Sequence, residues 1–178
     1  SKKVAEIIKV IKKKKTNKTA LCAGNIATAE AAQFLIKNGV DIIKVGIGPG
    51  SICTTRLVAG IGVPQLSAII EVKKGVRNKK IKIISDGGIK YSGDISKAFG
   101  AGGDFVMMGS MFAGHHECAG ELIEEDGNKY KLFYGMSSER AMQKHYGGMA
   151  SYRSSEGRSI KIPYKGALTD TVNDYLGG

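Results

Sequence analysis

The chain contains 178 residues, of which 42% are hydrophobic, 24% are charged and 25 are glycine, a composition typical of a soluble globular α/β protein with many tight turns. No apolar run approaches the ~18 residues that a bilayer-spanning helix needs, so the sequence predicts no membrane protein. Three widely spaced cysteines and the lack of a signal-like apolar start favour a cytoplasmic protein without a disulfide framework.

The chain carries a formal net charge of +11, which suits nucleic acids and also small ligands that bear phosphate. The densest basic run, residues 12–15, falls at the end of the predicted first helix, where cations complement the helix dipole. No aromatic residues interleave with these lysines to stack on bases, which favours a solvated helix end. The charge by itself leaves both classes of ligand open.

Apolar periodicity and turn residues predict an alternation of helices and strands. In chain order these are a helix over 3–15, a strand over 19–23, a helix after Thr28 that stops at Asn38-Gly39, a strand over 41–45, a helix after Pro64, a strand over 81–85, a helix over 92–100 and a strand over 104–108. In the helix over 92–100, Ile95, Ala98 and Phe99 are expected to face inward. This pattern predicts a parallel sheet, either in a (β/α)8 barrel or in an open doubly wound fold. No GxGxxG follows the first strand, which disfavours a dinucleotide-binding Rossmann domain.

The character of the sequence changes near residue 120. Residues 121–123 and 129–134 flank Asp126-Gly127, a strong hairpin signal. The polar stretch 135–163 has little periodicity, and such a long segment favours a functional flap. Leu168, Val172 and Leu176 then predict a helix. The hairpin and flap together form an insertion at about 120–163.

Four βα units are too few for an eight-stranded barrel. An isolated half would leave two unpaired strand edges and one uncovered sheet face. The sequence is therefore expected to be part of a longer polypeptide, or to be completed by a half from elsewhere.

The loop over 46–56, GIGPGSICTTR, surrounds Cys53 with glycines after a buried strand. Loops at the carboxyl ends of strands often carry function, which favours a nucleophilic thiolate over a small buried hydrophobe. Later strands end at Asp86-Gly87-Gly88 and Gly109-Ser110, which could hold a phosphate through backbone N–H groups or be ordinary turns.

Several motifs resemble the IMP dehydrogenase/GMP reductase family over essentially the whole chain: GIGPGSICTT, ISDGGIKYSGDISKAFGAG, FVMMGSMFAG, KLFYGMSSERAMQKHYGG, YRSSEG and PYKG. The resemblance implies the second half of a (β/α)8 TIM barrel, formed by residues 1–178 as the C-terminal half of one catalytic domain. The flap resembles the reductase branch, since it lacks the Arg-Tyr pair of the dehydrogenases. VAGIGVPQ and GGIKYSGD look more like microbial dehydrogenases.

The resemblance implies NADPH-dependent conversion of GMP to IMP and ammonia through a covalent thioimidate between the cysteine and the purine. One alternative is IMP dehydrogenase, which oxidises IMP with NAD+ and water to XMP. A further alternative is a non-catalytic basic module that binds nucleic acid. The resemblance also implies a homotetramer that binds neither nucleic acid nor a membrane.

The family's functional positions fall on matching residues of this sequence. The implied catalytic residues are Cys53, Thr55 and Glu156. The implied substrate-binding residues are Asp86, Gly87, Gly88, Gly109, Ser110, Gly135, Met136, Ser137, Arg153, Ser154, Ser155 and Gly157. The implied cofactor-binding residues are Ile47, Gly48, Met136, Tyr152 and Arg153, and the implied K+ ligands are the carbonyls of Gly48, Gly50, Cys53 and Arg56.

Overall fold

A computed structural model describes residues 2–14, 19–77, 80–135 and 159–178. The chain forms two compact units. The sheet unit comprises Ser1–Pro49, Val63–Gly87 and Ile95–Met107, and the hairpin unit comprises Gly50–Gly62, Gly88–Asp94 and Met108–Gly178.

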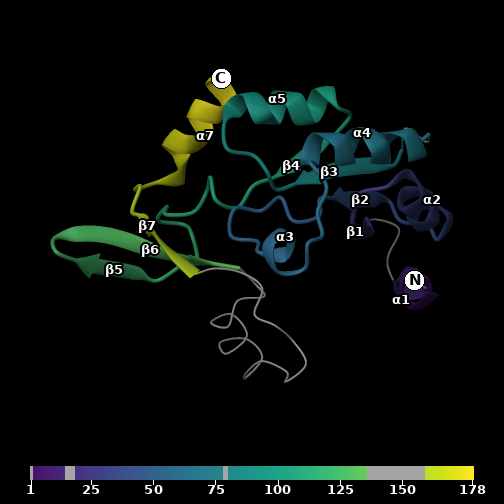
Figure 1. Cartoon of the computed structure of the whole chain (residues 1–178), viewed down its shortest axis with the longest axis horizontal. Coiled ribbons are helices and arrows are strands. Elements are labelled where there is room, and N and C mark those ends of the chain that lie inside the picture. Colours follow the sequence, from purple (N-terminus) through teal and green to yellow (C-terminus); the bar gives the residue numbers. More distant parts are fainter. Residues whose placement is uncertain (1, 15–18, 78–79, 136–158) are drawn as a thin grey trace. The chain divides into compact units, whose positions relative to one another are not determined.

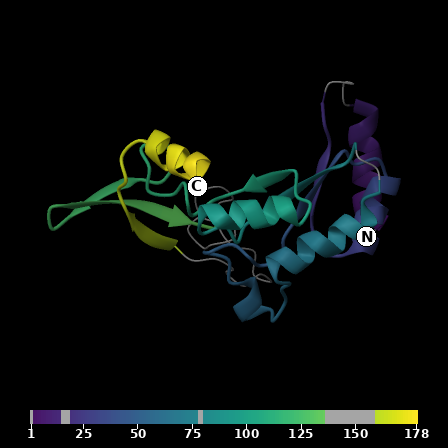
Figure 2. The ribbon, with the colours of Figure 1, turned by 90° about the horizontal axis from the view of Figure 1, so that it is seen from above.

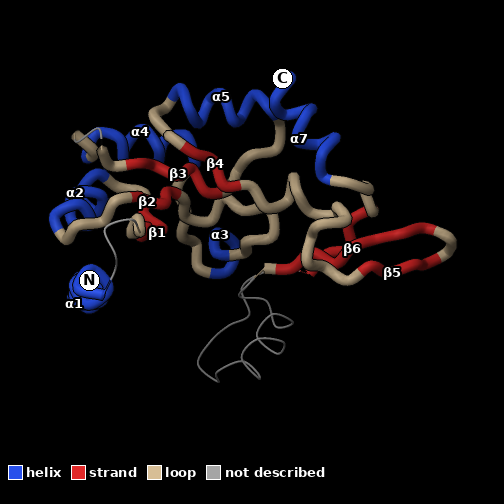
Figure 3. The backbone as a smooth tube through the Cα atoms, turned by 180° about the vertical axis from the view of Figure 1, so that it is seen from behind, coloured by secondary structure: helices blue, strands red, loops and turns tan. Residues whose placement is uncertain are grey.

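The sheet unit contains a parallel sheet of the four strands β1 (Cys22–Ile26), β2 (Ile42–Val45), β3 (Lys82–Asp86) and β4 (Phe105–Met107), in the order β1-β2-β3-β4 (Figures 1 and 3). The predicted α/β class and parallel pairing are confirmed. The prediction of the first strand over 19–23 was wrong at both ends. Pairing with β2 sets the strand, and its register begins at Cys22 opposite Ile42. Leu21 lies just before the strand, and its N–H donates to Oδ2 of Asp41, the residue that precedes β2, at 2.7 Å.

Strand alternation divides the sheet into two different faces. Ile43, Val45, Ile83 and Ser85 are fully buried, and the first residue of α4 (Gln65–Gly75) bonds to Val45 and Ser85, so this is the helix-covered face. Because successive side chains point to opposite faces, Lys44 and Asp86 project from the other face.

Helix α2 (Ala29–Lys37) packs against α4 so closely that a Cβ at Gly75 would lie 2.5 Å from the Ala29 carbonyl oxygen. Its predicted cap is confirmed, because Thr28 Oγ1 accepts from the Ala31 N–H at 3.2 Å. The helix ends at Asn38 and Gly39, as predicted, and Gly39 has a φ of +93°.

Helix α1 (Lys2–Lys14) confirms the predicted first helix. Its Val4, Ile7 and Ile11, together with Cys22 and Phe34, line an apolar cavity of about 440 Å³.

Helix α5 (Ser92–Gly100) has the predicted bounds, yet one of its predicted inward residues is wrong. Ala98 is buried, whereas Phe99 is 47% exposed. Adjacent residues are about 100° apart around the helix axis. Because Ala98 faces the core on the packing side of α5, Phe99 points toward solvent.

The hairpin unit contains an antiparallel sheet of β5 (Leu122–Glu125), β6 (Asn128–Tyr134) and β7 (Ser159–Pro163), in which β6 is central (Figure 1). Asp126 and Gly127 have φ values of 50° and 74°, as a type I′ turn requires, so the predicted hairpin is confirmed. The turn closes the hairpin at the far left of Figure 2. The sequence missed β7, which lies at the end of the stretch predicted as flap. The alternation of apolar and polar residues in β7 is too short to recognise in the sequence. All five residues of β7 pair with β6.

Helix α7 (Leu168–Gly177) is held by residues far away in the sequence. Glu117 accepts the Leu168 N–H at 3.0 and 3.2 Å through its two carboxylate oxygens, and Thr171 Oγ1 lies 3.0 Å from Nε2 of the buried His115. Backbone hydrogen bonds from Glu117 itself and from Leu168 lower the pKa of the Glu117 carboxyl. Among the described helices, none is long and apolar enough to cross a membrane.

Candidate active site

The loop after β2 presents its cysteine to solvent. Cys53 is exposed, and its N–H donates to the Gly50 carbonyl oxygen at 3.1 Å in a tight turn. The short helix α3 (Thr55–Val58) begins two residues later. Within this chain the cysteine is therefore not buried for packing, and the loop position predicted from the sequence is confirmed.

The thiol has one hydroxyl partner within its own loop. Cys53 Sγ donates to Thr55 Oγ1 at 3.2 Å. Thr55 is the first residue of α3, and its carbonyl oxygen accepts the Ala59 N–H at 2.8 Å. The helix therefore fixes the backbone of Thr55, whose hydroxyl lies beside the sulfur. A hydroxyl in this place can exchange a proton with the sulfur or with a group bound to it.

The turns after β3 and β4 have the backbone geometry expected for their glycines. Gly87 and Gly88 have φ values of 85° and 81°, which L side chains rarely adopt. After β4, the Gly109 carbonyl oxygen accepts the Phe112 N–H at 3.1 Å. Gly88, Gly109 and Ser110 belong to the same compact unit as Cys53, whereas Asp86 and Gly87 belong to the sheet unit.

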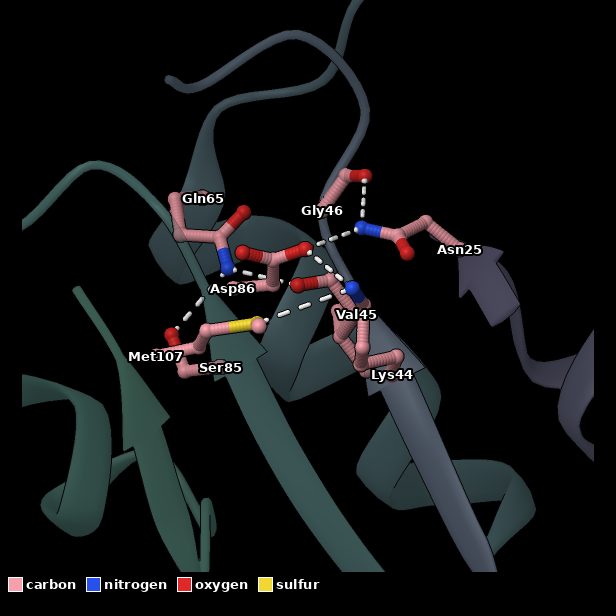
Figure 4. A network of polar contacts seen from close by, with 8 residues as sticks. All are labelled: Asn25, Lys44, Val45, Gly46, Gln65, Ser85, Asp86 and Met107. Atoms are coloured by element: carbon pink, nitrogen blue, oxygen red, sulfur yellow. Dashed lines mark hydrogen bonds and ion pairs between the residues drawn. The ribbon is translucent and has the colours of Figure 1, made fainter. Parts of the chain in front are cut away.

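A network of polar side chains lies at the carboxyl edge of the parallel sheet (Figure 4). Asp86 forms an ion pair with Lys44 Nζ at 3.0 Å through Oδ2, and the same oxygen accepts from Asn25 Nδ2 at 2.8 Å. The predicted ribose-binding carboxylate therefore has two protein partners. Sequence reasoning named neither of them, although a lysine within the otherwise apolar strand Ile42–Val45 was a usable signal.

Gln65 joins the network from the helix-covered face. Its Nε2 donates to the Val45 carbonyl oxygen at 2.9 Å and lies 3.1 Å from Ser85 Oγ. These contacts connect α4 to the ends of β2 and β3. Gly46 follows β2 here because a Cβ at this position would lie 2.4 Å from the Asp86 carbonyl oxygen.

Part of the predicted site lies outside the described residues: Met136, Ser137, Tyr152, Arg153, Ser154, Ser155, Glu156 and Gly157. Gly135 is described and directly follows β6. Within the described part of the chain, no group of three or more His, Cys, Asp or Glu side chains converges as a metal site. The predicted K+ ligands are backbone carbonyls and so belong to no such side-chain cluster.

Comparison with known proteins places this site in a family. The model of the "IMP dehydrogenase / GMP reductase domain" matches residues 1–178. The chain is 55% identical over 178 residues to GMP reductase 1 of Mus musculus and to GMP reductase 2 of Homo sapiens, covering all of this chain and 51% of each relative. A GMP reductase of Yersinia enterocolitica is 54% identical over 158 residues, 89% of this chain and 46% of the relative. The chain thus spans about half the length of these curated relatives. It belongs to the IMP dehydrogenase/GMP reductase family.

Proposed function

We propose that the complete protein is an NADPH-dependent GMP reductase that converts GMP to IMP and ammonia. The observation that carries this proposal is the exposed thiol of Cys53, 3.2 Å from the Thr55 hydroxyl on the loop after a parallel strand. The curated relatives, which are 54–55% identical to this chain over the matched residues, bear the name GMP reductase, which favours the reductase over the dehydrogenase.

The fold proposed for the complete protein is a (β/α)8 barrel, with residues 1–178 as its second half and with the hairpin and flap inserted at about 120–163. Two observations support it. The sheet is open at β1 and at β4, and on β4 the side chains of Phe105 and Met107 are 52% and 48% exposed. Closing the sheet with further strands would pair both open edges and enclose the face from which these apolar groups project.

In the proposed reaction, the Cys53 thiolate attacks C2 of the purine and forms a carbon–sulfur bond. The bond from C2 to the exocyclic nitrogen then breaks, and ammonia leaves with the added protons. NADPH, when bound, supplies the hydride that C2 receives. The carbon–sulfur bond breaks in the last step, returning the electron pair to sulfur and releasing IMP. A covalent nucleophile divides one difficult displacement into two easier steps.

Thr55 and Glu156 are the proposed acid/base pair for these proton transfers. The contact between Cys53 Sγ and Thr55 Oγ1 supports the role of Thr55. For Glu156, which is outside the described residues, the family resemblance supports the role.

The nucleotide would be held by its phosphate and its ribose. Backbone N–H groups of Gly88, Gly109 and Ser110 are proposed for the phosphate, and Asp86 for the ribose hydroxyls, with Gly87 between them. Gly135, Met136, Ser137 and residues 153–157 would contact the base. The cofactor would lie against Ile47, Gly48, Met136, Tyr152 and Arg153.

The proposed K+ would take the backbone carbonyls of Gly48, Gly50, Cys53 and Arg56. The donor set suits a hard cation, which prefers oxygen ligands. The Gly50 carbonyl accepts one hydrogen bond from Cys53 and has a second lone pair for an ion. By the same resemblance we infer a cytoplasmic homotetramer with no nucleic-acid partner.

The test is turnover by the complete protein. GMP with NADPH should give loss of NADPH absorbance and release of ammonia. Reduction of NAD+ in the presence of IMP, without turnover of GMP, would contradict the proposal in favour of the dehydrogenase. Binding of nucleic acid without either turnover would contradict both enzymes.

A further inference from the structure

Four neighbouring strands each contribute one side chain to a row across the carboxyl edge of the sheet (Figure 4). The row is Asn25, Lys44, Asp86 and Met107, from β1, β2, β3 and β4 in order. In the register of the sheet Asp86 lies opposite Met107, and Lys44 lies opposite Ile84, two residues before Asp86. Lys44 therefore reaches along its strand toward the edge, where its Nζ also lies 3.6 Å from Met107 Sδ.

Asn25 enters the row because the pairing of β1 with β2 is irregular. Gly24 lies opposite Lys44 and Ile26 opposite Val45, so Asn25 is an extra residue in its strand. Such a bulge redirects a side chain. The Asn25 amide donates both to the Gly46 carbonyl oxygen at 3.0 Å and to Asp86 Oδ2 at 2.8 Å.

Both partners of the Asp86 carboxylate hold the same oxygen. Lys44 Nζ and Asn25 Nδ2 contact Oδ2 at 3.0 and 2.8 Å, and neither of these contacts involves Oδ1. The Lys44 and Asp86 side chains are only 29% and 25% exposed, so their attraction is less screened than that of a surface pair. The carboxylate is thus held in one rotamer by one oxygen, and Oδ1 can accept a hydrogen bond from a ligand.

We propose that Lys44 is a positioning residue that orients the Asp86 carboxylate for ribose hydroxyls and so favours ribonucleotides over 2′-deoxyribonucleotides. The Asn25 amide donates a hydrogen bond to the same oxygen. Without Lys44, the carboxylate can rotate about its side-chain bonds, and binding of a diol must then restore the order. The inference rests on the proposed function, because it takes Asp86 as the residue that binds the ribose.

The experiment compares GMP with 2′-deoxy-GMP in the complete protein, using turnover and calorimetric binding. Lys44→Met keeps the length of the side chain and removes its charge. It should raise KM and Kd for GMP about tenfold, the effect of losing one charged hydrogen-bond partner. The change for 2′-deoxy-GMP should be smaller, and kcat should stay within about threefold because Lys44 is not expected to touch the reacting atoms. Lys44→Arg should restore most of the preference for GMP.

The matched control is Lys82→Met. Lys82 forms the same kind of ion pair, with Asp104 Oδ1 at 2.9 Å, between β3 and the start of β4. Loss of this ion pair should leave KM and Kd unchanged for both GMP and 2′-deoxy-GMP. If Lys44→Met does not fold, Lys44→Gln serves in its place.

The outcomes distinguish the role of Lys44 from the proposed reaction. If Asp86→Asn loses the preference for GMP and Lys44→Met retains it, the role of Lys44 is wrong while the proposed function stands. If the unaltered protein binds neither nucleotide, the proposed function is wrong and the inference falls with it. An equal loss with both nucleotides in Lys44→Met would indicate a merely structural lysine.

Discussion

The Cys53 thiol donates a hydrogen bond to the Thr55 hydroxyl across 3.2 Å, two residues along the same loop. The sulfur is exposed, while the hydroxyl belongs to the first turn of α3. The Cys53 sulfur is thus accessible to a ligand, and it lies beside the hydroxyl of Thr55, a residue whose backbone is fixed in a helix.

Cys53→Ser should abolish the covalent adduct with the nucleotide and leave GMP binding largely intact. A serine hydroxyl is a far weaker nucleophile and a poorer leaving group than a thiolate. Mass spectrometry after a rapid quench measures the adduct. Cys22→Ser, which changes another exposed cysteine, is the control and should keep it. An adduct that survives in Cys53→Ser would remove this residue from its role.

Thr55→Val should lower kcat about 10²-fold, the lower range for loss of a general acid or base. Valine keeps the shape of the side chain and removes only the hydroxyl. Thr55→Ser, which retains the hydroxyl, should stay within about tenfold of the unaltered protein. Steady-state kinetics with GMP decides this. Equal activity of the valine and serine variants would show that the hydroxyl only stabilises the loop.

Gly46→Ala should destabilise the sheet unit by about 3 kcal/mol. The residue has φ +148°, and a Cβ would lie 2.4 Å from the Asp86 carbonyl oxygen, a backbone atom that cannot turn aside. Gly93→Ala is the control, since nothing lies within 4 Å of its Cβ and the residue is in α5. Because Gly93 lies in the first turn of the helix, that change should alter the free energy of unfolding by less than about 1 kcal/mol. Urea denaturation at constant m-value measures both.

Asp104 should make the free energy of unfolding of the sheet unit fall at low pH. Burial raises the pKa of its carboxyl, but hydrogen bonds from Lys82 and from the Ile83 N–H, with the charges of Lys82 and Lys73, outweigh burial and lower the pKa below 3.8. A group whose pKa is lower in the folded state stabilises fully above its unfolded pKa and loses that effect as the pH falls through the folded value. Asp104→Asn should therefore cost stability at pH 7 and remove part of the decline below about pH 4.

The measurement is the urea midpoint of both proteins between pH 7 and pH 2.5. Asp126→Asn, in the exposed hairpin turn, is the control and should leave the curve unchanged. Parallel curves for Asp104→Asn and the unaltered protein would contradict the prediction.

The sequence alone determined the features that depend on neighbouring residues. Thr28 caps α2 through the N–H three residues on, and Asp126-Gly127 closes its hairpin through its own φ values. Local apolar periodicity predicted the alternating strand and helix segments, and the loop position of Cys53 predicted an accessible thiol. In each of these cases the energetic preference is local, so the pattern of residues records it.

Only the tertiary structure decided what depends on pairing between distant segments. Strand β7 exists because β6 offers it a partner, and Glu117 caps α7 from 51 residues away. Asn25 and Lys44 reach Asp86 because sheet register and one bulge bring three strand ends together. A one-residue change of register would send each side chain to the opposite face, and no local pattern fixes that register.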